Sequence, residues 1–536
     1  MKVQQLIYLT IFLFFALSSQ GQTDINTFAD IHFNGSTKPY NSRTSSMGYT
    51  IWESIDHECG YERSSQVMQA AGRKLPKLAQ SNFESLAKGG VRIGCISISP
   101  IERQFINSSS FYNEKNKKAT VSCVTGIVAN QLFLRQREID YFSDLVNNIQ
   151  YLKRFENKPY RIGGFQYYYT LIQKKSEVDS VIANPDHIGL VLTVAGGHAL
   201  GHSIYINEGI TSLEEYHDLV IQNVKRLKGL LPFSDNSDEY IQTPILWMSP
   251  CKNYENGLGG AANSMTKAQQ SVFGKPNDLN EGPSDLGKEV LEMLISKDGR
   301  RILVDIKHMS LKFRRFYYQT VERASILGEQ IPIVCSHTGI SGLSWQGGLY
   351  KKRDDDSKNN NSYLNHWQQN LSEQDIKKIA ASRGLIGITL DKTVLGGQLA
   401  LSEIESTVAG TVQRRKACVK LFLANVLTVI DKVGTPAAWN IIAVGSDFDN
   451  MYEPLDPYPS AEYLPDLASD IQEFLERPED IGSEFPAKKI KELMFNYSAA
   501  EITEKIMSLN AVEFIRRNLD DRKLDADKET SSTNDR

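Results

Sequence analysis

Four side chains that can bind a metal ion or transfer a proton follow apolar runs of this sequence. They are His32 in ADIHFNG, His308 in LVDIKHMS, His337 in PIVCSHTG and Asp447 in IAVGSDFDN. Histidine and carboxylate groups ligate zinc and act as general acids and bases. Any one of them alone would be typical of a hydrogen-bonded structural residue, but three of only nine histidines share this context. The pattern therefore indicates one site for a metal ion or for proton transfer.

The apolar runs before these residues belong to a set of eight that recurs along the chain. Most are near-continuous in Val, Ile and Leu rather than alternating, which is typical of strands buried on both faces. The runs are Phe28–Phe33, Val91–Ile98, Ile188–Val194, Pro244–Met248, Ile302–Ile306, Pro332–Cys335, Leu385–Leu390 and Ile441–Val444.

Segments with helical spacing separate several of these runs. Their ends are marked by the cap signal Thr211-Ser212, the capping-box pattern Ser372-x-x-Asp375, and Gly434 after a long helical run from Arg414 to Val433. Strands that alternate with helices predict an α/β fold of the (β/α)8 TIM-barrel type with insertions. An open doubly wound sheet is the competing architecture, but it would normally carry a G-x-G-x-x-G turn, which the sequence lacks. In a barrel the carboxyl ends of the strands meet at one mouth, where we expect the four side chains to converge.

The chain is expected to form one domain between two segments outside the fold. Lys2, the apolar stretch from Leu6 to Leu17 and the small-residue site at Gly21 predict a signal peptide over residues 1–21. The barrel domain is expected over residues 22–519, and the apolar-poor tail over residues 520–536 is expected to be disordered. We therefore expect an exported protein, whether periplasmic, extracellular or at the cell surface. An uncleaved membrane anchor is the alternative.

Composition narrows the classes of partner and of structural site. The formal net charge of -4 argues against a nucleic-acid partner. No apolar run after the N-terminal segment is long enough to span a membrane. Six cysteines follow that segment without a C-x-x-C motif, which argues against a structural zinc site of that type. Disulfides are permitted by export, but the apolar surroundings of Cys95 and Cys335 favour buried free thiols there.

The same residues carry a resemblance to the membrane (renal) dipeptidase family of zinc metallopeptidases. That family has D-x-H-x-D, E-G-G-H, D-x-x-H-x-S, S-H and G-x-D-F-D segments in this order. The chain shows DIHFN, AGGHAL, DIKHMS, CSH and GSDFD in the same order, over roughly Ala29 to Asn496. The resemblance implies a barrel of the metallo-dependent hydrolase type that hydrolyses dipeptides.

The resemblance also implies a role for each of the four side chains. His32 would ligate the first zinc ion, and His308 and His337 the second. Asp447 would be the acid/base carboxylate beside the bridging water, and it is preferred to Asp449 because it lies nearer the strand end. In the family, the two metal ions share the hydroxide that attacks the peptide carbonyl.

Three positions depart from the family pattern. Asn34 stands where a metal-binding carboxylate is expected, and an amide is a weaker zinc ligand. Ala195 stands where the family has the Glu that bridges both metal ions, and Pro250 where it has a substrate-contacting His. His198 matches the family's own His and is the alternative candidate for a substitute ligand, whereas Lys307 has no role in the family pattern.

Two functions follow, from different classes. The first is a metal-dependent hydrolase of dipeptides or related small amides whose zinc centre is altered and whose activity is lost or weakened. The second is a non-catalytic barrel that binds a peptide-like ligand or a protein partner. Neither zinc site reaches three protein ligands without the missing bridge, so we expect weak zinc binding and a possible pseudoenzyme.

Overall fold

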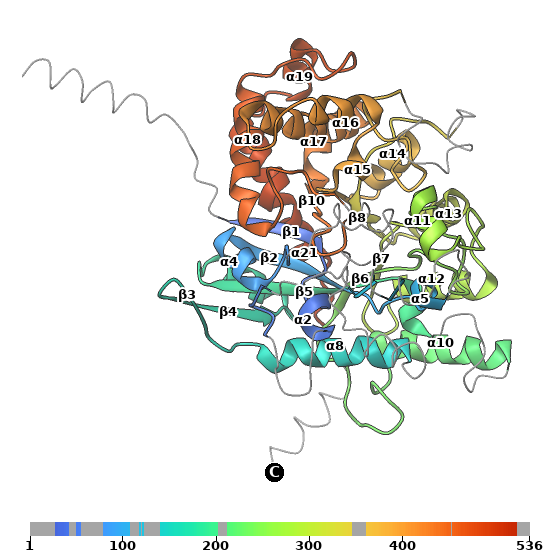
Figure 1. Cartoon of the computed structure of the whole chain (residues 1–536). Helices are drawn as coiled ribbons and strands as arrows, with labels where there is room; N and C mark the ends of the chain where they lie inside the picture. The colour runs from blue at the N-terminus through green and yellow to red at the C-terminus, as the bar shows by residue number, and fades with distance from the viewer. Residues whose placement is uncertain are drawn as a thin grey trace, which may run out of the picture.

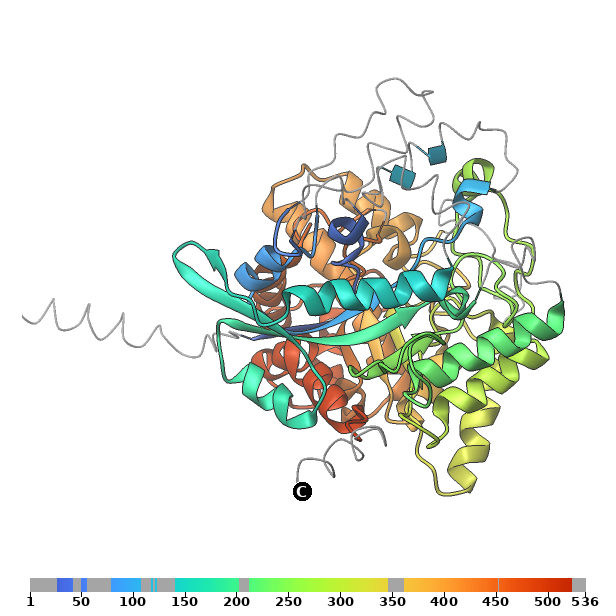
Figure 2. The same cartoon turned by 90° about the horizontal axis from the view of Figure 1, so that it is seen from below.

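A curled sheet of parallel strands runs through the middle of the protein, with helices packed around it (Figure 1; Figure 2, seen from below). The computed structural model describes residues 27–41, 50–54, 79–107, 117–118, 121–122, 140–201, 212–345, 361–451 and 453–522. The protein is therefore a mixed α/β structure, as the sequence predicted.

All eight apolar runs form strands, and these strands pair in parallel. One sheet contains β1 (Phe28–Phe33), β2 (Val91–Ile98), β5 (His187–Ala195), β6 (Ile245–Ser249) and β7 (Leu303–Val304). The other contains β8 (Val334–Thr338), β9 (Leu385–Ile388) and β10 (Ile442–Val444). Every residue of β1 and β2 is buried, as expected for strands covered on both faces.

Isolated bridges connect the two sheets at both of their edges. Asp305 bridges Val334 in parallel beyond β7, and Phe33 of β1 bridges Phe448 beyond β10. At the second connection the backbone N–H of Asp447 donates to the carbonyl of His32 at 3.0 Å. The ends of β1 and β10 therefore lie side by side.

One buried apolar cluster receives side chains from all eight of these strands. Phe514 and Ile515 of the C-terminal helix α21 pack into the same cluster. The strand residues in it include Ala29, Ile93, Val191, Leu246, Leu303, Val334, Leu385 and Ala443.

A β-hairpin that the sequence analysis did not predict lies beside β5. It consists of β3 (Tyr160–Ile162) and β4 (Phe165–Leu171), joined by Gly163 and Gly164, which both have positive φ. β4 also pairs in parallel with the first half of β5. The signal was a Gly-Gly pair between aromatic segments, a sequence suited to a tight hairpin turn.

The helices begin and end where their capping residues predicted. Ser212 accepts the N–H of Glu215, Ser372 and Asp375 form a capping box, and Gly434 ends the longest helix with φ of 70°. The α-helices are α2 (Thr37–Asn41), α4 (Phe83–Lys88), α5 (Gln104–Asn107), α8 (Tyr141–Phe155), α9 (Lys175–Ile182), α10 (Leu213–Leu227), α11 (Lys267–Phe273), α12 (Asp285–Ile295), α13 (Leu311–Ile326), α14 (Glu373–Ala381), α15 (Lys392–Leu395), α16 (Gln398–Glu405), α17 (Val412–Val433), α18 (Leu464–Glu476), α19 (Ala487–Leu493), α20 (Ala499–Glu504) and α21 (Asn510–Asn518). Short 3-10 segments cover Gly197–Leu200, Pro436–Asn440 and Ala461–Tyr463, and a π-helical turn covers Lys505–Leu509.

Several sequence predictions concern segments outside the described residues. These are the N-terminal segment over residues 1–21, Cys59, Cys123 and most of the tail. The tail prediction began at residue 520, yet Asp520 is described and accepts the N–H of Arg301 at 2.7 Å. Within the described part of the chain, no helix has the length and apolar character needed to cross a membrane. The four cysteines that the structure describes, Cys95 and Cys335 among them, are buried free thiols.

Candidate functional site

The three histidines from the sequence motifs meet at the carboxyl ends of their strands. The rings of His32 and His337 stack with centroids 3.8 Å apart, and the centroid of His308 lies 5.3 Å from that of His337. Asp447 Oδ1 lies 3.7 Å from His32 Nε2. All four side chains are buried. The structure therefore brings together the residues that the sequence analysis singled out, although they come from four different strands.

Two buried aspartates hold these strand ends in register by the same set of hydrogen bonds. Asp30 accepts the N–H of His32 and both the N–H and the hydroxyl of Ser446. Asp305 accepts the N–H of Lys307 and both the N–H and the hydroxyl of Ser336.

These bonds place the functional side chains because each serine precedes one of them in the chain. Ser446 is followed by Asp447, which is thereby set beside His32. Ser336 is followed by His337, which is thereby set beside His308. The aspartates of the D-x-H and D-x-x-H motifs thus act as positioning residues.

His308 and Asp447 share an unusual backbone conformation. Their φ angles are 66° and 65°, in the left-handed region that non-glycine residues rarely adopt. Neighbouring backbone fixes both, since Ala262 N–H donates to the His308 carbonyl at 2.7 Å and Asp447 N–H donates to His32. Such conformations cluster at functional sites.

Asp447 and Asp449 differ sharply in their surroundings. Asp449 forms a buried ion pair with Lys38 at 2.9 Å and accepts hydrogen bonds from Ser81 and Gln80. Asp447 accepts only the side-chain amide of Asn450, at 3.1 Å, and its carboxylate faces His32. Asp449 is therefore a structural carboxylate, and Asp447 is the one that faces the histidines.

Burial sets the protonation states in this cluster. It raises the pKa of Asp447 to about 7, although the charges of Lys307 and Lys252 oppose the shift. Burial also holds the pKa of each of the three histidines well below the usual range, and the same two lysine charges add to the effect. The contact between His32 and Asp447 is therefore not an ion pair between two charged groups, because the imidazole stays neutral.

Unpartnered ring nitrogens are the strongest sign of a ligand in this cluster. His32 Nδ1, His337 Nε2 and both ring nitrogens of His308 are buried without a hydrogen-bond partner. Buried polar atoms are normally satisfied by protein, water or a ligand. A possible metal site is formed by His32, Asp305 and His337. Each offers one ligand atom, and these three atoms lie within 4.8 Å of one another.

The carboxylate of that trio already accepts three hydrogen bonds. Asp305 Oδ1 accepts two backbone N–H groups, each at 3.0 Å, and Oδ2 accepts the Ser336 hydroxyl at 2.6 Å. About one of the four acceptor positions of this carboxylate therefore remains for a metal ion, beside the neutral imidazoles of His32 and His337.

The three substituted positions differ in what they could offer a metal ion. Asn34 is buried, and its Nδ2 has no hydrogen-bond partner among the described residues. Ala195 and Pro250 have no side-chain donor atom. The carbonyl of Ala195 accepts the hydroxyl of Ser99 at 2.9 Å, and the carbonyl of Pro250 accepts Gly197 N–H and Asn256 Nδ2.

One ring nitrogen of His198 is engaged outside the cluster. Its Nε2 lies 2.8 Å from the carbonyl oxygen of Pro100, and its ring packs edge-on against Tyr141. Its Nδ1 is buried without a hydrogen-bond partner among the described residues, but His198 is not part of the group formed by His32, Asp305 and His337.

Two buried lysines accompany the histidines. Lys252 Nζ donates to the Ser99 hydroxyl at 2.5 Å, and that hydroxyl in turn donates to the Ala195 carbonyl. Lys307 Nζ donates to Gln369 Oε1 at 3.1 Å. The sequence motifs did not predict a role for Lys252 or Lys307. The signal in the sequence was their position, because Lys307 directly precedes His308 and Lys252 lies two residues after the substituted Pro250.

These residues do not fit a centre of two zinc ions. Such a centre needs negative ligands to offset the repulsion between two dications. The two carboxylate positions of the family hold Asn34 and Ala195, and the positive charges of Lys252 and Lys307 act on the same histidines. The surroundings of the three histidines are therefore poorly suited to a pair of cations.

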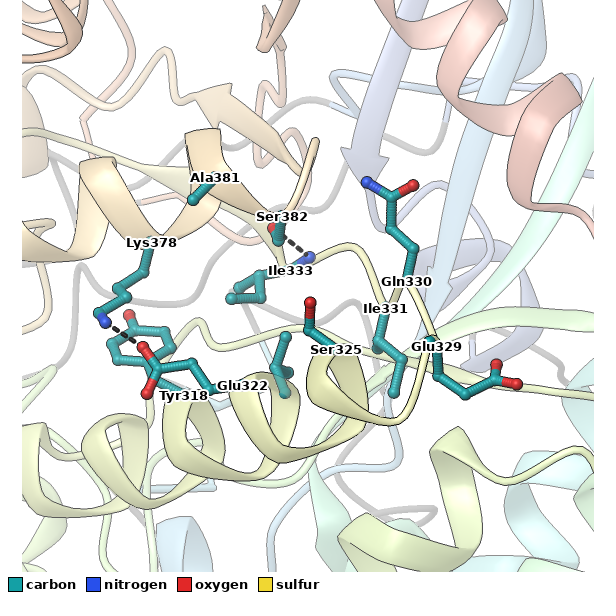
Figure 3. Close-up of a pocket in the computed structure, with 12 residues that line it drawn as sticks. Tyr318, Glu322, Ser325, Glu329, Gln330, Ile331, Ile333, Lys378, Ala381 and Ser382 are labelled. Carbon is teal, nitrogen blue, oxygen red and sulfur yellow. Dashed lines mark hydrogen bonds and ion pairs between the residues drawn. The ribbon is translucent and has the colours of Figure 1, made fainter.

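A separate pocket lies between α13 and α14, away from the histidines (Figure 3). Its lining includes Ile331 and Ile333, which precede β8, whereas His337 lies near the other end of that strand. An ion pair between Lys378 and Glu322 flanks it. None of the predicted site residues lines this pocket.

Comparisons with known proteins give matches among solved structures alone. No family model matches the chain, and no curated protein does. A dipeptidase described as a metallopeptidase of family M19 is 13% identical, with 92% of this chain and 98% of that chain covered and a TM-score of 0.44. A metallopeptidase from Rhodobacter sphaeroides, liganded with a phosphinate mimic of L-Ala-D-Ala, has the same identity and TM-score, with 92% and 99% covered.

The probable dipeptidase PvdM from Pseudomonas aeruginosa is also 13% identical, with 85% and 99% covered and a TM-score of 0.43. These neighbours are dipeptidases and related metallopeptidases. They are the kind of protein that the ordered motifs indicated. At this identity and TM-score, the likeness by itself carries no argument about the chemistry of this chain.

Proposed function

We propose that this chain is a diverged relative of the membrane dipeptidases whose pocket no longer supports two-zinc hydrolysis of dipeptides. The observation that carries the proposal is the presence of Lys252 and Lys307 among His32, His308 and His337. The order of the motifs supports the family, and the lysines support the loss of activity.

The proposed fold is a closed (β/α)8 barrel. Its support comes from the bridges at both edges of the two sheets and from the buried cluster to which all eight parallel strands contribute. The interior of such barrels is filled by layers of side chains from the strands, and the active groups lie at the carboxyl ends. His32, His337 and Asp447 occupy that end.

The charge balance explains why the metal centre would fail. Two unit charges 4 Å apart interact by about 4 kcal/mol at an effective dielectric constant near 20. Replacing two carboxylates by Asn34 and Ala195 removes attraction for cations. Lys252 and Lys307 add repulsion in their protonated form, although burial lowers the pKa of both. Without two bound metal ions, the water that serves as nucleophile is not acidified in the family's manner.

The test is elemental analysis of the purified protein, together with dipeptide turnover measured in zinc-buffered solution. We expect less than one zinc ion per chain after dialysis and turnover far below that of a family member with all its metal ligands. Two tightly bound zinc ions together with brisk hydrolysis would refute the proposal.

A non-catalytic role in binding a peptide-like ligand is the second candidate function. The specific observation in its favour is that His308 has two unpartnered, buried ring nitrogens beside the unpartnered Nε2 of His337. At a site without function, we would expect such groups to be hydrogen-bonded or to be replaced by apolar residues. Each buried polar group without a partner destabilises the fold by about 1–3 kcal/mol. Binding of a dipeptide without any turnover, measured on the same preparation, would favour this candidate over weakened hydrolysis.

A further inference from the structure

We propose that the hairpin of β3 and β4 docks on the surface of an anionic phospholipid bilayer. The name arm is used below for this hairpin and the two residues before it, residues 158–167. At its tip the apolar Phe165 follows Gly163 and Gly164. The inference is independent of the proposed function, because the arm shares no residue with the histidine cluster.

The arm extends beyond the sheet that carries it. β5 begins at His187, which pairs with Tyr168, so the part of β4 before Tyr168 has no partner in β5. β3 pairs with this part alone, from Phe165 to Tyr167. Both views of the molecule show the hairpin projecting from its side (Figure 1; Figure 2). A flat surface can therefore reach the tip.

One face of the arm is apolar up to its end. Tyr160 pairs with Tyr167 on this face. Ile162 pairs with Phe165 on the same face, because directly opposed residues of a hairpin share a side and the sides alternate along each strand. Trp52 stacks on Tyr160, with ring centroids 5.0 Å apart, and covers the base of the face. Phe165 stays 65% exposed, so the uncovered end of this apolar face is an aromatic ring.

The arm carries positive charge. Between Glu156 and Glu177 the chain has four basic residues and no acidic one, in a protein of formal net charge -4. Two of the four, Lys158 and Arg161, belong to the arm and are exposed. Among the described residues, neither forms an ion pair with a carboxylate. An aromatic ring at the tip beside basic side chains is suited to the interface of an anionic bilayer, where aromatic and basic residues are favoured.

Acidic residues that approach the arm from other segments have local partners. Glu53 accepts a backbone N–H at 2.8 Å, and Glu84 pairs with Lys88 at 2.9 Å. The charge of Asp186 acts on Arg92, whose positive charge offsets it. The arm therefore keeps its positive charge although the whole chain is negative.

Hydrogen bonds fix the base of the arm. Glu156 accepts the N–H of Leu171 at 2.8 Å, and the N–H of Asn157 donates to the carbonyl of Tyr169 at 2.9 Å. The hydroxyl of Tyr169 donates to the carbonyl of Leu152 at 2.6 Å. Because these bonds hold the hairpin in place, docking does not have to order it first.

The tip faces the side on which the chain enters the fold. β1, β2, β4 and β5 are parallel, so their amino ends face the same way. Phe28 begins β1 and Phe165 begins β4, whereas the histidines follow the carboxyl ends of strands. The apolar stretch from Leu6 to Leu17 precedes Phe28 in the sequence. A bilayer on this side would leave the histidine cluster facing away from the lipid.

The experiment is co-sedimentation with vesicles of phosphatidylcholine alone and of phosphatidylcholine with about one third phosphatidylglycerol. The protein is the chain from Gln22 onward, which contains every described element, so the apolar stretch before it cannot account for binding. We expect binding to the anionic vesicles, and we expect high salt to weaken it because salt screens the attraction between exposed charges.

Two variants of the arm and two matched controls test the site. Phe165→Ser should lower the partition coefficient about fivefold or more, because the ring no longer leaves water. Arg161→Gln should also lower it about fivefold, which corresponds to about 1 kcal/mol for one basic residue near the surface. Val412→Ser removes an apolar side chain of 64% exposure, and Lys488→Gln removes a lysine whose side chain is 90% exposed. Both lie outside the arm and should leave binding unchanged.

The proposal is refuted if the unmodified protein does not bind the anionic vesicles, if it binds neutral vesicles equally well, or if either arm variant binds like the unmodified protein. Equal losses in the arm variants and the controls would also refute it. Sedimentation equilibrium without lipid is measured on the same proteins. A dimer that Phe165→Ser dissociates, without lipid binding, would assign the arm to a second copy of this chain. None of these results changes zinc content or turnover, so the proposed function is tested separately.

Discussion

Ser446 donates its hydroxyl to Asp30 at 2.5 Å, across the connection between β10 and β1. The Ser336 hydroxyl donates to Asp305 at 2.6 Å beside β8 in the same manner. Residues far apart in the sequence are joined by these bonds, and each serine is followed directly by a residue of the histidine cluster. The two pairs therefore connect the stability of the sheet to the geometry of the pocket.

Removing either hydroxyl is expected to destabilise the fold. Ser446→Ala and Ser336→Ala each leave a buried aspartate with one acceptor position unfilled, which costs about 1–3 kcal/mol. Urea unfolding followed by circular dichroism measures the change. Ser406→Ala is the control, because the exposed Ser406 bonds only the carbonyl of Glu403 and should change stability by less than about 0.5 kcal/mol. Equal effects in all three variants would contradict the structural role of the pairs.

The two aspartates of the GSDFD segment are expected to respond in different ways to the same substitution. Asp449→Asn breaks the buried ion pair with Lys38 and should cost about 3–5 kcal/mol, because removing one member of a buried ion pair is strongly destabilising. Asp447→Asn removes a carboxyl that burial already disfavours in its charged form, so the fold should be at least as stable at pH 8. Guanidinium unfolding of both variants checks this, and a more harmful Asp447 substitution would overturn the assignment.

Asp278 is expected to make stability fall as the pH rises. Burial, followed by the negative charge of Glu255, raises the pKa of Asp278 to about 7 in the folded protein, from 3.8. The folded state therefore keeps this proton over a range in which the unfolded state loses it. The stabilisation is complete below about pH 4 and is lost as the pH rises towards 7.

The variant Asp278→Asn removes this dependence. It should be more stable than the unmodified protein by about 1–3 kcal/mol at pH 8, after discounting for the partial exposure of the group, and the gain should shrink towards pH 4. Urea unfolding at pH 4, 6 and 8 measures it. The exposed Asp238, changed to Asn, is the control and should show no such trend. A gain that grows on acidification would contradict the raised pKa.

Restoring the family's carboxylates should restore metal binding more fully when Lys252 is removed as well. In the double variant Asn34→Asp with Ala195→Glu, the new glutamate lies beside Ser99, which bonds Lys252, so the ammonium group competes with a metal ion for it. Adding Lys252→Met should raise zinc affinity about tenfold further. Zinc binding is measured by competition with a chromophoric chelator. Equal affinity of the double and triple variants would show that Lys252 does not oppose the metal.

The N-terminal segment predicts export, and this stays a prediction because residues 1–21 lie outside the described part of the chain. Protein purified from its native host should begin after Gly21, as the apolar stretch and small-residue site require. N-terminal sequencing or intact-mass spectrometry measures the cleavage. A chain that retains Lys2 would favour the uncleaved anchor instead.

The sequence by itself determined the strands and the residues at their ends. Near-continuous apolar runs predicted β1, β2 and the other six parallel strands. A strand that is buried on both faces has apolar side chains on both, so its sequence does not alternate with polar residues. The convergence of His32, His308 and His337 followed from the rule that parallel strands of one sheet end on the same side. The helix ends at Ser212 and Gly434 could also be predicted from the sequence, because a helix end depends on a few neighbouring residues.

Tertiary structure alone decided which of these side chains are free to act. Asp449 lies in the same GSDFD segment as Asp447, yet a lysine and hydrogen bonds from distant segments engage it. Lys252 carries no motif, but the fold brings its charge to the histidines. Coulomb interactions and desolvation depend on distances through space, and these are set by contacts between segments far apart in the chain. The residue types therefore determine which side chains can bind a metal ion or transfer a proton. Their packing determines which of these side chains are already engaged by other residues.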